Sequence, residues 1–156
     1  MSKPKAYILV GVPGSGKSTW YKNNEWVDPA VYVSTDHFIE IEANRVGKTY
    51  SEVFDNYMST AVRLMTETVN EAKKLKMNIV WDQTSTTIVS RRKKFNMLPN
   101  YEMIAVVFPT PDTEELKKRL ASRPGKHIPT HVIKSMISNW QEPTEAEGFD
   151  KIIYIK

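Results

Sequence analysis

The chain contains no cysteine, which excludes a disulfide framework, a thiolate metal site and a cysteine nucleophile. No apolar run approaches the ~18 residues that a membrane-spanning helix needs. The N-terminal residues lead through a short apolar segment into a glycine-rich turn, which is not the pattern of a secretory signal. We therefore expect a cytoplasmic protein without a membrane partner. No repeat, low-complexity tract or linker divides the 156 residues, so residues 1–156 are expected to form one domain.

Positive charge is in small excess and is concentrated in one part of the sequence. The formal net charge is +4, and residues 91–127 alone contain nine Lys and Arg against four Asp and Glu. A local basic excess favours an anionic partner, although charge runs also serve simply to keep a surface solvated.

Five short apolar runs are typical of strands covered on both faces, because most are continuously apolar instead of alternating. They lie at residues 6–10, 31–33, 78–81, 103–108 and 151–155. Between them, apolar residues at helical spacing predict a long helix over about residues 51–76 and others after Pro111 and Pro129. This alternation predicts a parallel sheet with helices on both faces, in which ligands bind beyond the carboxyl ends of the strands.

Residues 11–18 (GVPGSGKS) match the phosphate-loop pattern G-x-x-x-x-G-K-[ST] between a predicted strand and a predicted helix. The glycines permit positive φ and close backbone approach, so that successive N–H groups can surround nucleotide phosphates. We expect a solvent-facing Lys17 to bridge the β- and γ-phosphates of ATP and Ser18 to bind Mg²⁺. The residues predicted to bind the nucleotide here are Gly11, Pro13, Gly14, Ser15, Gly16, Lys17, Ser18 and Thr19.

Two aspartates follow predicted strands at the same edge of the sheet. Asp36 is a candidate general base for a hydroxyl that attacks the γ-phosphate, or it only caps a helix that starts near His37. Asp82 ends the third strand, where an acid commonly holds a Mg²⁺-bound water, or it is a turn-forming residue. We predict that Asp82 and Ser18 together form the metal site.

Arg119 and Arg123 are four residues apart on one face of a predicted helix that Pro124 and Gly125 end. Arginines at a flexible helix end can fold over a triphosphate and stabilise the charge that develops during transfer. The same pattern also suits a solvated basic helix end. Trp20, directly after the phosphate loop, belongs to the core or stacks on a base.

Taken together, these motifs resemble the 5′-kinase domain of end-healing polynucleotide kinases, which occurs in phages and, fused to a 3′-phosphatase, in animals. The similarity extends over nearly the whole chain in the order of the family. Besides the phosphate loop and Asp36, it includes residues 82–85 (DQTS) with the arginine pair after them, the segment 116–129 that ends in HIP, and residues 143–149 (PTEAEGF). The resemblance implies a P-loop kinase of adenylate-kinase-like, three-layer α/β/α fold, with about five parallel strands and a small lid.

The resemblance also implies an activity: transfer of the γ-phosphate of ATP, with Mg²⁺, to a 5′-hydroxyl end of DNA or RNA. Position by position, Lys17 and Ser18 take the phosphate-loop roles, Asp36 is the general base and Arg123 is the lid arginine, so that Lys17, Asp36 and Arg123 are the expected catalytic residues. From its spacing to Arg123, Arg119 is also expected to bind the nucleotide. A cytoplasmic site of action would include the host cytoplasm if the protein is encoded by a phage.

The acceptor strand is expected to meet the basic run and the matched segment before it. Thr84, Arg91 and Arg92 are the candidate acceptor-binding residues. One departure from the family leaves the acceptor open, because some members carry Asn-Arg before the catalytic Asp and Arg three residues after it. Here Ser34-Thr35 and Ile39 occupy those positions.

Two other functions therefore stay open on the sequence. The first is a P-loop kinase that phosphorylates a different hydroxyl, on a nucleoside, another small molecule such as an antibiotic, or a hydroxymethylated base in DNA. The second is a binding module in which ATP hydrolysis only controls affinity for a partner.

Overall fold

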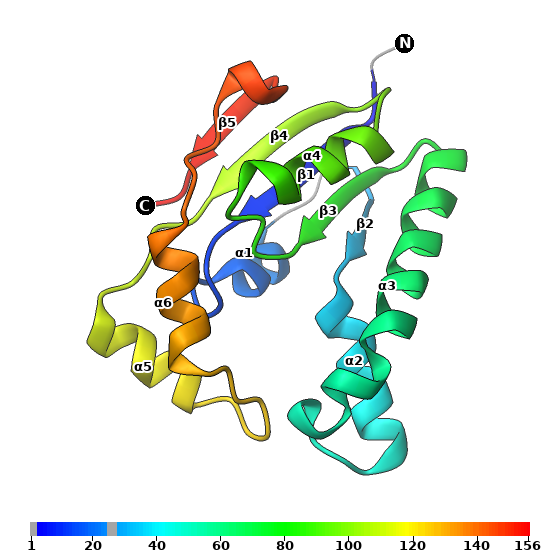
Figure 1. Ribbon diagram of the computed structural model, residues 1–156. Coiled ribbons are helices and arrows are strands. Elements are labelled where there is room, and N and C mark those ends of the chain that lie inside the picture. The colour runs from blue at the N-terminus through cyan, green and yellow to red at the C-terminus, as the bar shows by residue number, and fades with distance from the viewer. Residues whose placement is uncertain (1–2, 25–27) are drawn as a thin grey trace.

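A computed structural model describes residues 3–24 and 28–156, which build a five-stranded sheet flanked by helices (Figure 1). All neighbouring strands are parallel, in the order β2-β3-β1-β4-β5. The parallel α/β prediction is confirmed, and the expected strand bounds differ from those observed by at most one residue at each end. The strands are β1 (Lys5–Val10), β2 (Ala30–Val33), β3 (Asn78–Asp82), β4 (Glu102–Val107) and β5 (Lys151–Tyr154).

The helices alternate with the strands as the sequence indicated, with one addition. They are α1 (Lys17–Asn23), α2 (Thr35–Val46), α3 (Tyr50–Lys74), α4 (Ile88–Met97), α5 (Thr113–Ala121), α6 (Thr130–Ser138) and the 3₁₀ turn η1 (Glu145–Glu147). The sequence did not indicate α4, because its apolar pattern is weak and two of its buried positions are Arg91 and Lys94. No helix in the described part of the chain is long and apolar enough to cross a membrane.

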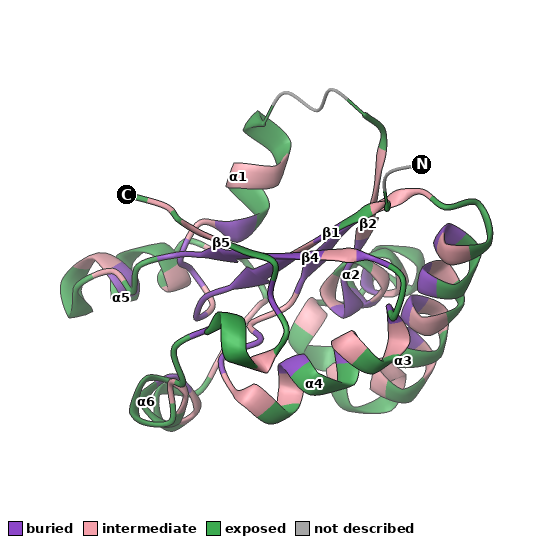
Figure 2. Ribbon diagram, turned by 90° about the horizontal axis from the view of Figure 1, so that it is seen from above, coloured by how far each residue is buried: buried purple, intermediate pink, exposed green. Residues whose placement is uncertain are grey.

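The two faces of the sheet are covered unequally (Figure 2). The long helix α3 and helix α4 cover one face, where Val69, Trp81 and Leu98 belong to the larger part of the core. On the other face α1 packs against a smaller cluster that includes Leu9 and Phe108. The sheet is therefore the middle layer of a three-layer fold whose layers differ in thickness.

Helices α2 and α3 form a hairpin whose ends are fixed by local capping. The N-cap of α2 is Ser34, whose side chain accepts a hydrogen bond from the backbone N–H of His37. Helix α3 begins with a capping box, in which Thr49 and Glu52 satisfy each other's backbone N–H groups. Between them Gly47 ends α2 at a φ of 69°, a left-handed conformation that favours glycine.

Helices α5 and α6 and the loop of residues 122–129 between them are called the lid below. Leu116 and Ile133 of the lid pack against Val12 of the phosphate loop, so the lid rests directly on that loop. In Figure 1 the lid and the α2–α3 hairpin lie on opposite sides of the carboxyl ends of β1, β2 and β3. The candidate site lies between these two arms.

Candidate active site

The phosphate loop joins β1 to α1 and has the backbone geometry that its sequence predicts. Gly14 and Gly16 have φ values of 83° and 101°, which a residue with a side chain rarely adopts. A Cβ built on Gly16 would meet nothing within 4 Å, and the hydroxyl of Ser15 is buried with no hydrogen-bond partner in the described chain. Open space over the loop beside an unpaired buried hydroxyl fits a cradle for phosphate oxygens.

Lys17 is the first residue of α1, and its side chain turns back over the loop. Its ammonium donates hydrogen bonds to the backbone oxygens of Gly11, at 2.9 Å, and Val12, at 3.0 Å. The residue is only 8% exposed, so the expectation of a solvent-facing lysine is wrong. Burial lowers the pKa of Lys17 to about 8, while the carboxylate of Asp82 opposes the shift and the charge of Arg123 adds to it.

Ser18 and Asp82, the predicted metal ligands, lie against each other. The hydroxyl of Ser18 donates to Oδ2 of Asp82 at 2.8 Å, and the hydroxyl of Tyr32 donates to the same oxygen. Burial raises the pKa of Tyr32 above its ordinary value, and its hydrogen bond to Asp82 adds to this. Asp82 is buried at the end of β3, so it is a side chain of the site and not a turn former.

These residues fit a Mg²⁺ ion that also binds a nucleotide. A hydroxyl and a carboxylate are oxygen ligands of the kind that Mg²⁺ prefers, and Mg²⁺ usually takes one or two carboxylates together with phosphate and water. Among the described residues, no group of three acidic or histidine side chains is placed to hold a metal unaided.

Asp36, the predicted general base, is the second residue of α2, and Ser34 is the cap of that helix. The alternative that Asp36 only caps the helix is therefore wrong. Its carboxylate accepts a hydrogen bond from the hydroxyl of Tyr50 at 2.6 Å and another from the ammonium of Lys126 at 3.0 Å. About half of the Asp36 side chain stays exposed, so this carboxylate is still accessible to a hydroxyl from outside the protein.

The two lid arginines take different positions. Arg119 lies on α5 and donates a hydrogen bond to the backbone oxygen of Gly14 at 3.0 Å, which ties the lid to the phosphate loop. Arg123 lies beyond the end of α5, so the two do not share one helix face as expected. Arg123 is half-buried in the lid, and its charge adds to the lowering of the Lys17 pKa that burial causes.

The three residues predicted to bind the acceptor differ in burial, and one of them cannot contact an acceptor. Arg91 is fully buried, and its guanidinium forms an ion pair with Glu147 at 2.6 Å and donates to the backbone oxygens of Ser85 and Gln141. It holds α4 to the segment before β5, so the expectation that it contacts the acceptor is wrong.

The other two candidates are compatible with that role. Arg92 is exposed on α4, and Thr84 is half-buried next to the phosphate loop, where its backbone oxygen accepts from the N–H of Gly11. Their contact with an acceptor stays a prediction.

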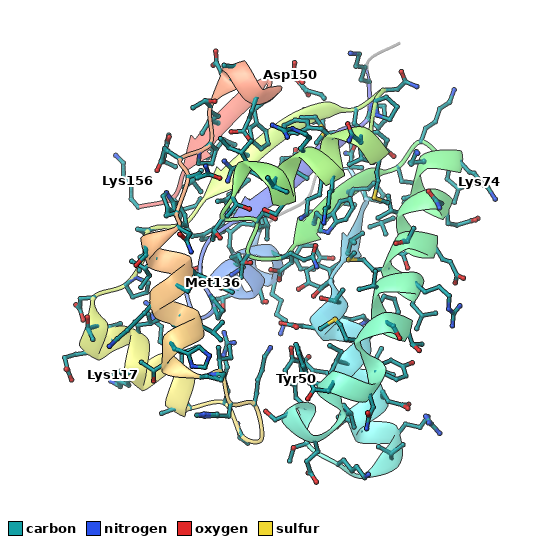
Figure 3. The ribbon with its side chains drawn as sticks, viewed as in Figure 1. Tyr50, Lys74, Lys117, Met136, Asp150 and Lys156 are labelled. Atoms are coloured by element: carbon teal, nitrogen blue, oxygen red, sulfur yellow. The ribbon has the colours of Figure 1, made fainter. Side chains whose placement is uncertain are left out.

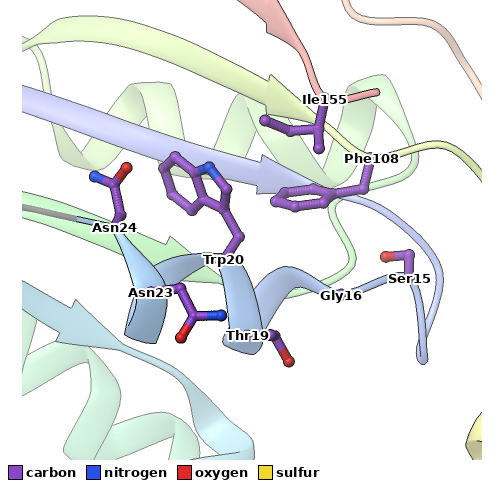
Figure 4. Close-up of a pocket in the computed structure, with 8 residues that line it drawn as sticks. All are labelled: Ser15, Gly16, Thr19, Trp20, Asn23, Asn24, Phe108 and Ile155. Atoms are coloured by element: carbon purple, nitrogen blue, oxygen red, sulfur yellow. The ribbon is translucent and has the colours of Figure 1, made fainter.

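A pocket of about 330 Å³ opens beside the phosphate loop (Figure 4). Trp20 and Phe108, which meet edge to face at 6.0 Å, form its apolar side. The residues that line it are Ser15, Gly16, Thr19, Trp20, Asn23, Asn24, Phe108 and Ile155. The sequence suggested Trp20 as either core or base-stacking residue, and here its ring faces both the core and the pocket.

Three side chains of the site were not found by the sequence reasoning: Tyr32, Tyr50 and Lys126. Each donates a hydrogen bond to one of the two aspartates from another element. Neither tyrosine lies in a recognisable motif, so no local pattern indicated it. Lys126 had a weak signal, because it directly precedes the HIP residues that were part of the family resemblance.

Comparison with known proteins agrees with this geometry. The family model AAA_33, described as an AAA domain, matches residues 7–143. The chain belongs to the AAA_33 family. The AAA_33 domain is also similar to a solved structure of the Pnkp1/Rnl/Hen1 RNA repair complex, with a TM-score of 0.68 and 26% sequence identity over 89% of this chain and 44% of the other.

Two curated relatives differ in what their names describe. The bifunctional polynucleotide phosphatase/kinase of Schizosaccharomyces pombe is 26% identical over 150 residues, which cover 93% of this chain and 32% of the relative. The human heterogeneous nuclear ribonucleoprotein U-like protein 2 is 24% identical over 156 residues, covering 94% of this chain and 21% of the relative. The chain thus spans about a third or less of the length of these relatives.

Proposed function

We propose that this AAA_33 domain transfers the γ-phosphate of ATP to a 5′-hydroxyl end of DNA or RNA. The observation that carries the proposal is the placement of Asp36: its carboxylate is half-exposed and bound by Lys126 of the lid, and Arg119 of the same lid donates to the backbone oxygen of Gly14 in the phosphate loop. A half-exposed carboxylate held near a phosphate-binding loop is the arrangement needed for attack by a hydroxyl on a bound phosphate.

In the proposed step, the oxygen of the acceptor hydroxyl forms a bond to the γ-phosphorus. The bond between this phosphorus and the β–γ bridging oxygen breaks, ADP leaves, and the carboxylate of Asp36 takes the hydroxyl proton. Lys17 and Arg123 stabilise the charge on the phosphoryl oxygens. Bound Mg²⁺, held by Ser18 and Asp82, would neutralise part of the phosphate charge.

The pocket beside the loop is the proposed site of the adenine base. Its apolar side suits a flat aromatic ring, and Asn23 and Asn24 at its rim supply amide donors and acceptors. Thr19, on α1 just after the phosphate loop, is also part of its lining.

Support for a polynucleotide acceptor comes from two sources. The Schizosaccharomyces pombe relative is named a bifunctional polynucleotide phosphatase/kinase, and the similar solved structure is that of an RNA repair complex. In addition, Arg92 and Lys93 are exposed on α4, which follows β3 beyond Asp82. Phosphate contacts of such residues predict that acceptor binding weakens as the salt concentration rises.

The test is an acceptor panel with ATP labelled in the γ-phosphate. We expect label on the 5′ end of DNA or RNA oligonucleotides, and Asp36→Asn to lower the rate by about 10²- to 10⁴-fold, the range of general base catalysis. Asp55→Asn, on the exposed side of α3, is the matched control and should keep the wild-type rate. Label only on a nucleoside, a small molecule or an internal modified base would overturn the 5′-end proposal.

The name of the human relative favours a second candidate, an ATP-dependent binding module for ribonucleoproteins. The same panel separates the two functions. ATP hydrolysis without any labelled acceptor, undiminished in Asp36→Asn, would support the binding module and contradict the proposed transfer.

A further inference from the structure

The carboxylate of Asp36 is held by two donors that come from different arms of the molecule. The hydroxyl of Tyr50, at the start of α3, donates to Oδ1 at 2.6 Å, and the ammonium of Lys126, in the lid, donates to Oδ2 at 3.0 Å. In sequence these partners are 14 and 90 residues away from Asp36. Both oxygens of the predicted base are therefore fixed, each by a separate element.

Tyr50 is a dependable donor. Burial raises the pKa of its hydroxyl well above the ordinary value, and the negative charge of Asp36 adds to this, so the hydroxyl keeps its proton. The ring packs against Phe54, one turn further along α3, with the ring centres 5.6 Å apart. Figure 3 shows Tyr50 on the side of the hairpin that faces the lid.

Lys126 is held from three directions. Its side chain is 12% exposed, and its ammonium contacts Asp36, lies 3.6 Å from the carboxylate of Glu40 and sits 4.4 Å from the centre of the Tyr50 ring. A cation this far out of water needs such partners. The contact is therefore a specific site for the lysine amine rather than a loose surface ion pair.

The lid backbone fixes the place of this amine. The backbone oxygen of Gly125 accepts from the N–H of Ser51, and the N–H of His127 donates to the Ser51 hydroxyl, at 3.0 and 2.9 Å. A Cβ on Gly125 would come within 2.7 Å of Thr49, so the close docking of the loop on α3 depends on glycine. Lys126 reaches Asp36 because the lid is docked on the hairpin.

The two donors leave the carboxylate of Asp36 free to accept a hydrogen bond from an acceptor hydroxyl. A carboxylate has about four acceptor positions, and Tyr50 and Lys126 occupy one on each oxygen, so each oxygen of Asp36 keeps one for an acceptor hydroxyl. Without them, a half-exposed aspartate would rotate among its rotamers. Alignment within about half an ångström is what makes a positioned base effective, so both contacts favour catalysis.

We propose that Tyr50 and Lys126 are positioning residues for Asp36, and that the base is aligned only while the lid is docked on α3. This inference rests on the proposed role of Asp36 as the base. Arg123 and Lys126 belong to the same loop, so one movement of the lid brings a cation to the nucleotide and aligns the base.

The first test compares Tyr50→Phe and Lys126→Met with matched controls. We expect kcat to fall about 10- to 100-fold in both variants, while KM for ATP changes by less than about twofold, because misalignment affects the transition state and not nucleotide binding. Tyr101→Phe removes a comparable buried hydroxyl that donates to Met77 far from the site, and Lys134→Met removes an exposed lid lysine. Both controls should retain the wild-type kcat.

The second test uses the absence of cysteine from the chain. In Lys126→Cys the introduced thiol is unique, and alkylation with 2-bromoethylamine turns it into a side chain with an amine at nearly the length of lysine. We expect kcat to fall in Lys126→Cys and to recover at least about tenfold after aminoethylation, whereas alkylation with iodoacetamide restores nothing. Equal recovery with both reagents, or none with either, would contradict a role of the amine.

A third measurement needs no acceptor. If the lid is docked, the thiol of Lys126→Cys should react with iodoacetamide at least about tenfold more slowly than that of Lys134→Cys, because only the first is packed against α3. Equal rates would overturn the docked lid.

The two proposals fail in different ways. If Asp36→Asn retains full transfer, the proposed base is wrong, and the positioning inference fails with it. If Asp36→Asn loses transfer while Tyr50→Phe and Lys126→Met keep the wild-type kcat, only the positioning inference fails. If the labelled hydroxyl is not a 5′ end, the same variants are measured on that hydroxyl, and the same outcomes decide.

Discussion

The donor side and the acceptor side of the site are built in different ways. The donor side consists of the phosphate loop, with Lys17 and Ser18, and of Asp82 on the strand beside it. The acceptor side consists of Asp36, Tyr50 and Lys126, which come from the α2–α3 hairpin and the lid. The donor side is fixed to the sheet, whereas the acceptor side exists only where two arms meet.

This difference has consequences for function. The shape of the phosphate loop depends mainly on its glycine conformations and on a backbone bond to Thr84 beside the sheet, with one further bond from Arg119 of the lid to Gly14. The acceptor side depends on the contacts between the lid and the α2–α3 hairpin, and a few contacts between two arms open more readily than a packed core does. We therefore expect substitutions on the donor side to affect nucleotide binding, and those on the acceptor side to affect transfer with little change in nucleotide binding.

The largest expected effect comes from Lys17→Met on the donor side. We expect transfer to fall by about 10²- to 10³-fold and ATP affinity to fall by at least tenfold, because a buried cation that meets phosphate oxygens is lost. Rates and equilibrium binding of ATP would be measured together. Loss of transfer with unchanged ATP affinity would contradict the distinction between the two sides, because Lys17 would then behave like an acceptor-side residue.

A pH titration sharpens this prediction. The pKa of Lys17 is about 8 in the folded protein and 10.5 in an unfolded chain, so its contribution to stability is present above pH 10.5 and is lost as pH falls through 8. ATP affinity should have the opposite trend and decline above about pH 8, because the neutral amine no longer attracts phosphate. Burial also lowers the pKa of Lys94 to about 8, but Lys94 lies over Trp81 in the core and not at the phosphate loop. The decline of ATP affinity above pH 8 should therefore persist in Lys94→Met.

The next largest effect is on stability, and it tests whether Arg91 belongs to the fold and not to the acceptor side. Arg91→Met should lower the free energy of unfolding by about 3–5 kcal/mol, because it leaves the buried carboxylate of Glu147 without its partner. Arg92→Met, one residue away and exposed, should change stability by less than about 0.5 kcal/mol and mainly weaken acceptor binding. Denaturant unfolding and the salt dependence of acceptor binding separate the two, and equal stability of both variants would contradict the assignment.

The smallest expected effect is on the Mg²⁺ requirement, and it distinguishes the tyrosines of the two sides. Tyr32→Phe removes a donor to Asp82, so we expect the Mg²⁺ concentration for half-maximal rate to rise by roughly tenfold, at the low end for residues that orient metal ligands. Tyr50→Phe should leave the Mg²⁺ requirement unchanged and lower kcat. A shift in the Mg²⁺ requirement with Tyr50→Phe instead would show that the two sides are coupled.

The predictability of each element follows from the range of its contacts. The strands were placed within a residue because each is a short, mostly apolar run, and the three central strands β1, β3 and β4 are largely buried on both faces. Helix α4 was not predicted because an arginine and a lysine occupy buried positions, and the burial of Arg91 depends on the distant Glu147 and Gln141. A basic run in sequence thus divides into buried and exposed halves that composition does not distinguish.

The sequence by itself determined the parallel sheet, the phosphate loop and the two strand-end aspartates, because each depends on neighbouring residues or on burial patterns repeated along one element. Tertiary structure alone decided that Lys17 is buried, that Arg91 belongs to the fold, and that Tyr50 and Lys126 meet at Asp36. These outcomes rest on contacts between residues far apart in the chain, and the strength of a charge or a hydrogen bond depends on which distant groups exclude water from it.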